Sequence, residues 1–438
     1  MPGPDMLAAP SALRVAHIDN GLHIIVQEVH SAPLVSVWCW YRVGSGDERP
    51  GLTGVSHWVE HMNFKGTTNI PRDQMKGIVE RFGGNWNGYT WIDQTTYLET
   101  AGRDALDTLL FIEAERMANG LYDADECEAE RTVIISELQG GDNDPDQLLD
   151  NEVTATAFHA HPYRHPTLGW LPDLQTMSRD DLFGHYRRYY VPSNATLVVV
   201  GDVDADDVLR RAEKHFGGIA DRPVPSRRRP AEPAQLGERR VTLEREGTTA
   251  YLKCAWRAPA AADAAFFPSL VLDAALTGAK GLNLWSSFRL APPQRKARLY
   301  SALVDRGLAS VVSGALLPTV DPFLYTISLT AMDGVGLPAL ESAFLETVET
   351  VRREGLRDEE IARAKRQLKA RLVFDTDSVT NLAHQLGYFE TVVGSGFFET
   401  LQSAVQQVTL DQVNDAARQW LGRETRTVGW FQPQEKRA

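Results

Sequence analysis

The segment HWVEH at residues 57–61 constrains this chain more than any other feature. On an α-helix, residues i and i+4 lie on one face and residue i+3 lies beside them. Two neutral imidazoles on one face, here His57 and His61, can take two corners of a tetrahedral Zn²⁺ site. The Glu60 carboxylate can then accept a proton from a water that the metal activates. The segment therefore predicts a zinc-binding helix, with a solvated helix face as the alternative, because short motifs also arise by chance.

A third protein ligand is expected from a second helix, since a catalytic zinc site uses three ligands and keeps one position for water. Residues 123–139 read DADECEAERTVIISELQ. Asp123 and Asp125 suit a helix N-terminus, where short acidic side chains cap and stabilise the first turn. Glu130 and Glu137 are seven residues apart, or two turns, and so share a face. The alternative is that both are solvated surface carboxylates, as most helical glutamates are.

Beyond these helices, the chain resembles the M16 (pitrilysin-like) peptidases, a family of zinc metallopeptidases. Their signature is H-x-x-E-H followed about 76 residues later by a ligand glutamate. Glu137 stands 76 residues after His61. The resemblance covers nearly the whole chain, and it is carried by the blocks GVSHWVEHMNFKGT at 54–67, GGNWNGYT at 83–90, HPYRHPTLGW at 161–170 and YVPSNAT at 190–196.

The resemblance implies a zinc-dependent endopeptidase that acts on peptides or small unfolded polypeptides. When the family's roles are assigned to the matching positions of this sequence, His57, His61 and Glu137 would bind Zn²⁺ and Glu60 would be the general base. Glu130 would orient a ligand histidine, because such histidines usually donate their second ring N–H to a neighbouring acceptor. A metal-storing module is another hypothesis, but a carboxylate such as Glu60 beside the metal favours chemistry.

The family's substrate-binding strand matches residues 85–90. Asn87, Gly88, Tyr89 and Thr90 are therefore expected to bind a peptide by β-augmentation, in which backbone hydrogen bonds give affinity with little sequence demand. The alternative for these four residues is an ordinary hairpin.

The organisation expected from the sequence is two similar α+β domains, because 438 residues exceed what one hydrophobic core supports. We expect a catalytic domain at 10–220, a Pro- and Arg-rich linker at 221–239 and a second domain without metal ligands at 240–434. Ser178 and Thr409, 231 residues apart, each suit a helix N-cap before a later strand, which is a weak internal repeat. The family implies an antiparallel sheet with helices on one side in each domain, together forming half of a clam-like chamber.

Composition excludes several classes of protein. A net charge of −13 argues against nucleic-acid binding, and no run of 18 apolar residues predicts a membrane span. Three widely spaced cysteines form no disulfide framework, which fits a reducing compartment. The N-terminus shows no signal peptide. We therefore expect a cytoplasmic protein, with a periplasmic one as the alternative if a signal peptide was removed.

One departure from the family pattern predicts a partner. Many members carry an Arg and a Tyr in the second half that contact substrate near the zinc. Leu303 and Ser310 stand at the matching positions here, while Arg298 and Tyr300 lie close by with the wrong spacing. In the two-subunit, processing-peptidase-like branch, the zinc and the Arg/Tyr pair reside on different chains. We therefore expect a zinc-bearing subunit that pairs with a homologous M16-like subunit, or alternatively a homodimer or a catalytically silent scaffold of the same fold.

Overall fold

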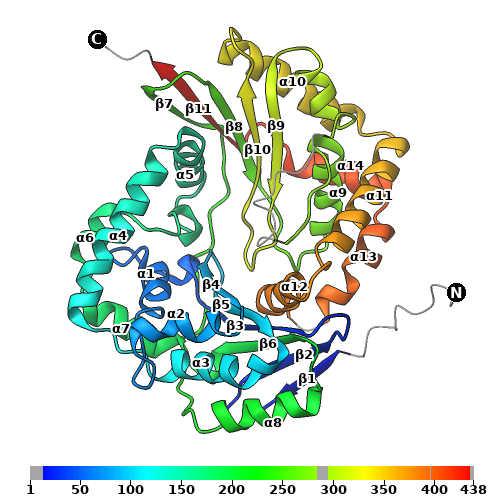
Figure 1. The fold of residues 1–438 in the computed structure, drawn as a ribbon. Coiled ribbons are helices and arrows are strands. Elements are labelled where there is room, and N and C mark those ends of the chain that lie inside the picture. Colours follow the sequence, from blue (N-terminus) through cyan, green and yellow to red (C-terminus); the bar gives the residue numbers. More distant parts are fainter. Residues whose placement is uncertain (1–12, 284–293, 395, 435–438) are drawn as a thin grey trace, which may run out of the picture. The chain divides into compact units, whose positions relative to one another are not determined.

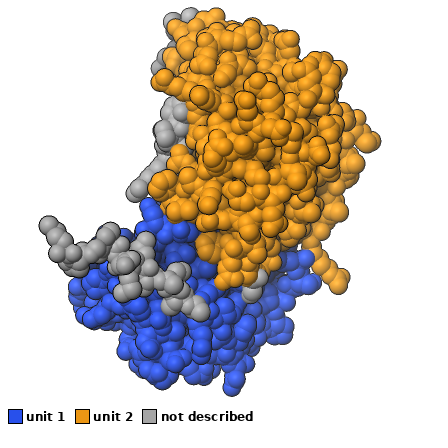
Figure 2. All heavy atoms as spheres, turned by 90° about the vertical axis from the view of Figure 1, so that its right-hand side faces the viewer, with its two compact units in different colours: residues 1–133, 167–227, 376–391 blue, residues 134–166, 228–375, 392–438 orange. Residues whose placement is uncertain are grey.

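The computed structural model describes residues 13–283, 294–394 and 396–434. Two compact units make up the chain, one from residues 1–133, 167–227 and 376–391 and one from residues 134–166, 228–375 and 392–438 (Figure 2). Each unit thus includes a segment from the opposite half of the sequence. The first twelve residues, on which much of the signal-peptide expectation rests, lie outside the described part. Among the described helices, none combines the length and the apolar character that a membrane crossing requires.

The first unit is built on a six-stranded sheet with the order β1-β2-β6-β3-β5-β4. All neighbouring strands are antiparallel except β2 and β6, which run parallel. A short loop that contains Asn20 and Gly21 joins the first two strands as a hairpin. The strands are β1 (Arg14–His17), β2 (His23–Glu28), β3 (Leu34–Tyr41), β4 (Asn85–Thr90), β5 (Thr95–Gly102) and β6 (Ala195–Gly201).

Both faces of this sheet are covered at its centre. Seven of the eight residues of β3 and all seven of β6 are buried, as expected for strands with protein on both sides. On one face, Tyr41 packs against Tyr97 and Tyr190. On the other, Trp38 and Trp40 contact α12, a helix from the C-terminal half of the sequence (Figure 1). The family resemblance implies helices on one side of the sheet, and α12 adds a helix on the opposite face.

Some helices of the first unit, among them α4 and α7, begin at a short polar side chain that caps them. Asp123 accepts hydrogen bonds from the backbone N–H groups of Asp125 and Glu126, and Ser178 forms a capping box with Asp181. The helices are α1 (Val55–Met62), α2 (Arg72–Glu80), α3 (Leu106–Ala118), α4 (Ala124–Asp142, which continues into the second unit), α6 (Leu171–Thr176), α7 (Arg179–Tyr189), α8 (Ala205–Phe216) and α12 (Val379–Val392), with 3-10 turns η1 (Ser45–Asp47), η2 (Arg103–Ala105) and η4 (Pro192–Asn194).

The second unit repeats the plan with a five-stranded sheet, β7-β11-β8-β10-β9, in which only β7 and β11 run parallel. Helix α5, from the N-terminal half of the sequence, lies along this sheet, where Lys253 of β8 pairs with Asp146 and Asp150 of α5. Its elements are α5 (Pro145–Ala157), η3 (Pro162–Arg164), β7 (Arg239–Glu246), β8 (Tyr251–Arg257), α9 (Phe266–Thr277), the π-helical turn η5 (Tyr300–Val304), β9 (Ala309–Leu316), β10 (Leu324–Ala331), α10 (Leu337–Glu354), α11 (Asp358–Phe374), α13 (Phe397–Gln407), α14 (Leu410–Trp420) and β11 (Arg426–Gln434).

The α+β class expected from the sequence is confirmed. Thr409 caps α14 with the same capping-box geometry that Ser178 gives to α7, so the two members of the weak repeat begin equivalent helices. Cys39, Cys127 and Cys254 are all buried thiols without disulfides. Burial raises the pKa of the Cys127 thiol to about 11, which is consistent with small core side chains rather than reactive groups.

Candidate metal centre

Helix α1 begins at a backbone geometry that requires glycine. Gly54 has φ of 90°, and a Cβ at this position would lie 2.4 Å from the Leu168 carbonyl oxygen. The Glu48 carboxylate accepts hydrogen bonds of 2.8 Å from the backbone N–H groups of Gly54 and Ser56. These bonds satisfy N–H groups that the helix itself leaves unpaired. The position and direction of α1, and so of its histidines, are fixed at this end.

Helix α4 is fastened to α1 by Arg131. Its guanidinium lies 4.7 Å from the ring centre of the buried Trp58, a cation–π geometry. The same group donates hydrogen bonds to the carbonyl oxygens of Leu174 and Met177. Because Trp58 lies between His57 and Glu60 in sequence, this contact holds α4 against the helix that carries the predicted site.

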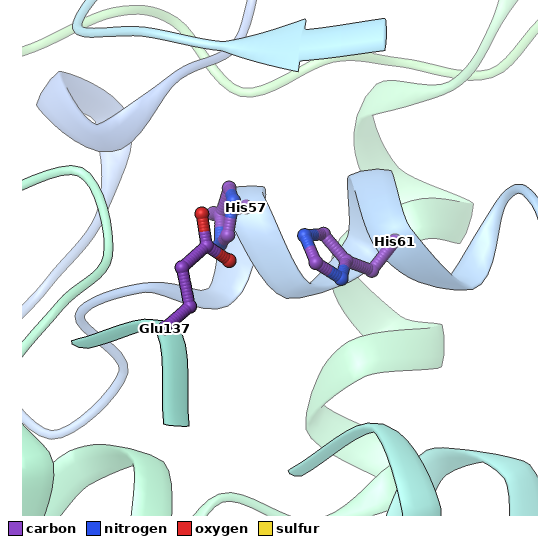
Figure 3. A group of neighbouring side chains, drawn as sticks. All are labelled: His57, His61 and Glu137. Atoms are coloured by element: carbon purple, nitrogen blue, oxygen red, sulfur yellow. The ribbon is translucent and has the colours of Figure 1, made fainter. Parts of the chain in front are cut away.

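The three predicted metal ligands come together. His57, His61 and Glu137 each offer one ligand atom, and these atoms lie within 4.8 Å of one another. Figure 3 shows that both histidines come from one helix, α1, and the glutamate from another, α4. Two imidazoles and one carboxylate form a donor set typical of catalytic zinc. The donor set and its spacing therefore fit a zinc ion that keeps one coordination position for water.

The charge state of His57 also suits a ligand. Burial, with a smaller contribution from the neighbouring His61, lowers the pKa of His57 to about 3. The imidazole is consequently neutral near pH 7, which is the form that binds metals. The His57 and His61 rings lie 4.5 Å apart between centroids.

Glu130 holds the second histidine. Its Oε1 lies 2.8 Å from His61 Nδ1, and its other oxygen is paired with the Lys65 ammonium. Burial raises the pKa of the Glu130 carboxyl, but the hydrogen bonds from His61 and Lys65 outweigh it and lower the pKa to about 2. With Nδ1 donating to this carboxylate, Nε2 of His61 carries the lone pair that a metal needs.

Glu60 lies on the same turn of α1 as His61 and is only 6% exposed. Its Oε2 accepts a hydrogen bond of 3.2 Å from Thr90 Oγ1 at the end of β4. A carboxylate held in this way has a defined orientation, which a general base requires.

Comparison with known proteins decides the family. The model described as "Insulinase (Peptidase family M16)" matches residues 23–170, and "Peptidase M16 inactive domain" matches residues 176–368. The chain belongs to the M16 peptidase family. The "inactive domain" match covers much of the half that lacks the H-x-x-E-H motif.

Individual M16 proteins match over nearly the whole chain. An uncharacterized zinc protease of Mycobacterium tuberculosis is 28% identical over 427 residues, covering 95% of this chain and 92% of the relative. The mitochondrial-processing peptidase subunit beta of Lentinula edodes is 26% identical over 416 residues, covering 93% and 87%. The crystal structure of a protease from Helicobacter pylori superposes with a TM-score of 0.89 at 23% identity, covering 97% of this chain and 100% of that one.

The four predicted substrate-binding residues of this M16 peptidase lie on β4, the last strand of the described sheet. Asn87 is exposed. A Cβ on Gly88 would lie 2.9 Å from Phe64 Cζ, so close packing accounts for that glycine. Tyr89 is hydrogen-bonded to His384 at 2.7 Å, and Thr90 is buried against Glu60. The side chains of Tyr89 and Thr90 therefore have structural partners, and a substrate role for the strand rests on its backbone edge.

The residues at the expected Arg/Tyr positions cannot act as that pair. Leu303 is fully buried and Ser310 is exposed on β9. The nearby Arg298 donates two hydrogen bonds, of 2.9 and 2.7 Å, to the Glu360 carboxylate on α11. Its guanidinium is thus committed to a contact within the second unit.

Three supporting residues were missed by the sequence analysis, namely Glu48, Lys65 and Arg131. Lys65 stands within the quoted block at 54–67, four residues after His61, and this spacing was the available signal. Glu48 and Arg131 have no comparable local signal, because their roles depend on how separate segments pack.

Proposed function

We propose that this chain is a zinc-dependent endopeptidase that hydrolyses peptides or small unfolded polypeptides. The observation that supports it most is the convergence of His57, His61 and Glu137 within 4.8 Å. Glu60, on the same helix as the two histidines, supplies a carboxylate that is not part of this ligand set. A metal-storing site has no need of an oriented carboxylate beside the metal, whereas hydrolysis has.

In the proposed hydrolysis, the metal and the protein's side chains have separate roles. Zinc bound at this centre would supply Lewis acidity that lowers the pKa of a coordinated water to about 7. Glu60 would take the proton from the attacking water and return it to the leaving amine. Thr90 holds Glu60 through Oε2, and Glu130 holds His61 in the tautomer that binds metal. Each of these groups is fixed before substrate arrives, which reduces reorganisation in the transition state.

The edge of the first sheet supports a peptide substrate. β4 pairs with β5 on one side and ends the described sheet on the other. An extended peptide can add to such an edge through backbone hydrogen bonds, which demand little of its sequence. β4 ends at Thr90, whose side chain contacts Glu60, so a peptide along this strand would run toward the general base.

The alternative is a catalytically silent scaffold of the same fold. The retained ligand set and the names of several relatives, which are zinc proteases, favour the enzyme. The test is peptide turnover together with zinc content measured by elemental analysis. We expect activity to be lost on chelation and restored by added Zn²⁺, and Glu137→Gln to lose most of its zinc. Full zinc occupancy in Glu137→Gln would contradict the ligand assignment, and turnover that survives complete removal of zinc would contradict the function.

We further propose that the active species pairs this chain with a homologous subunit. The support is that Leu303 has no polar group, that the Ser310 hydroxyl donates to the Thr330 carbonyl oxygen, and that Arg298 is bound to Glu360. A developing oxyanion needs such donors, and the loss of one typically costs about 10²–10³ in rate. One similar protein is by name a subunit of a processing peptidase.

The partner proposal is tested by mixing. Peptide turnover is measured for the chain alone and with a homologous subunit that lacks H-x-x-E-H but carries the Arg/Tyr pair, with mass determined by light scattering. We expect weak activity alone and a rise of about 10²-fold in the complex. A fully active monomer that gains nothing on mixing would refute the proposal.

A further inference from the structure

Helix α12 is an unusual neighbour for the first sheet, because it comes from residues 379–392, far from that sheet's own strands in sequence. It lies directly on β3. A Cβ on Gly387 would lie 2.0 Å from Trp40 Nε1, so the helix approaches the tryptophan more closely than any side chain at this position would permit. Figure 1 shows α12 beside the strands of this sheet.

Polar contacts fix α12 near both of its ends. Thr380 Oγ1 lies 2.8 Å from Thr100 Oγ1 on β5. Toward the other end, the Glu390 carboxylate lies 3.1 Å from His23 Nδ1 on β2, and both side chains are at least nine-tenths buried. Contacts to two separate strands set the helix in both position and rotation.

His384 lies between these ends and is fully buried. Its ring contacts Trp38 and Trp40 edge-on at 5.4 and 5.3 Å between centroids and stacks on Tyr388 at 5.7 Å. Its Nε2 is hydrogen-bonded to the Tyr89 hydroxyl at 2.7 Å. Burial lowers the pKa of His384 to about 3, so the ring is neutral near pH 7 and the pair carries no charge there.

Tyr89 connects this histidine to the candidate active site. Successive side chains of a strand point to opposite faces, so Tyr89 faces α12 while the next residue, Thr90, faces α1. Thr90 Oγ1 donates to Glu60 Oε2. A shift of Tyr89 toward or away from His384 moves the backbone of β4, and Thr90 moves with it.

We propose that His384 is a positioning residue for peptide hydrolysis: through Tyr89 it fixes β4, so that Thr90 orients Glu60 and the outer edge of the strand is set for substrate. This inference rests on the proposed endopeptidase function and adds a role for the C-terminal half of the sequence. It differs from the reading of His384 as an ordinary core histidine, whose loss would lower stability without changing the catalytic step.

The experiment uses the full chain, with its partner if one is required, and compares Tyr89→Phe, which removes one hydroxyl, with His384→Leu, which removes the ring. Thr380→Val is the matched control, because it weakens the same helix at a contact to β5 rather than β4. Zinc content, kcat and KM per zinc-bearing chain, unfolding midpoint, and hydrogen exchange of the Asn85–Thr90 amides are measured for each.

We expect both variants to keep their zinc. The hydrogen-exchange rate of the β4 amides should rise about tenfold or more, and kcat/KM should fall by about 10- to 100-fold, the scale for displaced reacting groups. Thr380→Val should leave kcat and β4 exchange near the wild-type values. A double-mutant cycle tests whether the effect of His384 on kcat depends on Thr90. In a Thr90→Val background, His384→Leu should lower kcat little further, although Thr90 and the Tyr89 side chain that His384 contacts lie on opposite faces of β4.

Unchanged β4 exchange, or a lower unfolding midpoint with unchanged kcat and KM, would overturn the inference, as would fully additive effects of His384→Leu and Thr90→Val on kcat. If the wild-type chain with its partner shows no zinc-dependent turnover, the proposed function itself fails. A wild-type enzyme that is active while both variants match it refutes the role of His384 alone.

Discussion

His61 and Glu130, 69 residues apart in the sequence, share a hydrogen bond of 2.8 Å between an imidazole nitrogen and a carboxylate oxygen. The carboxylate is 5% exposed and also pairs with Lys65. This contact determines that Nε2 of His61 would face a bound metal, and it ties α1 to α4 at the position where the predicted ligands converge.

Removing this carboxylate should weaken metal binding without abolishing it. We expect Glu130→Ala to lower zinc affinity by about 10- to 100-fold, the usual cost of losing the acceptor behind a ligand histidine. Competition with a fluorescent zinc chelator measures the affinity. Asp125→Ala, an exposed acidic residue on the same helix, is the control and should bind zinc as the wild type does. Equal zinc affinities for the two variants would contradict the role of Glu130 in orienting His61.

The close approach of α12 to β3 predicts a large effect from one methyl group. Gly387→Ala should lower the free energy of unfolding by about 1–3 kcal/mol, because the new Cβ overlaps Trp40 and the helix must shift. Urea unfolding followed by tryptophan fluorescence measures it. In Gly184→Ala, another helical glycine whose Cβ would meet nothing within 4 Å, stability should rise by about 0.5–1 kcal/mol. A neutral Gly387→Ala would show that α12 lies farther from β3.

Asp321 gives a prediction for pH. A hydrogen bond from His161, opposed by burial and assisted by one from Arg229, lowers the pKa of the Asp321 carboxyl to about 2. Because the folded pKa lies below the unfolded value of about 3.9, the stabilisation is fully present above about pH 5 and is lost as pH falls toward 2. Asp321→Asn should therefore lower the unfolding midpoint at pH 7, and the difference from wild type should shrink below about pH 4.

The control for this pH series is Asp333→Asn, an exposed carboxylate before α10, which should follow the wild type throughout. A difference between Asp321→Asn and wild type that stays constant from pH 7 to pH 3 would mean that the carboxylate charge does not stabilise the fold.

Features of the site that depend on helix periodicity could be predicted from the sequence. The spacing of His57 and His61, and of Glu130 and Glu137, is local, because one helix determines both members of each pair. The caps at Ser178 and Thr409 are local in the same sense. These features depend on residues that are close together in the sequence, so the sequence alone predicts them.

The supporting contacts could not be predicted, because they join segments that only the tertiary fold brings together. Tyr89 and His384 are separated by 295 residues, and no local pattern marks either as the partner of the other. The family resemblance predicts a substrate contact at Thr90, and the structure adds a contact with Glu60 that no local pattern indicates. The placement of α5 and α12 on their sheets likewise depends on tertiary contacts, such as that of Gly387 with Trp40, rather than on a local pattern.

The most direct test of the central claim is the Glu60→Gln variant, assayed for zinc content and peptide turnover beside the wild type. The side chain keeps its size and its hydrogen bond from Thr90 but can no longer accept a proton. The account predicts unchanged zinc content and a loss of at least about 10²-fold in kcat. Hydrolysis by Glu60→Gln at close to the wild-type rate would contradict the assignment of Glu60 as the general base, and with it the proposed mechanism.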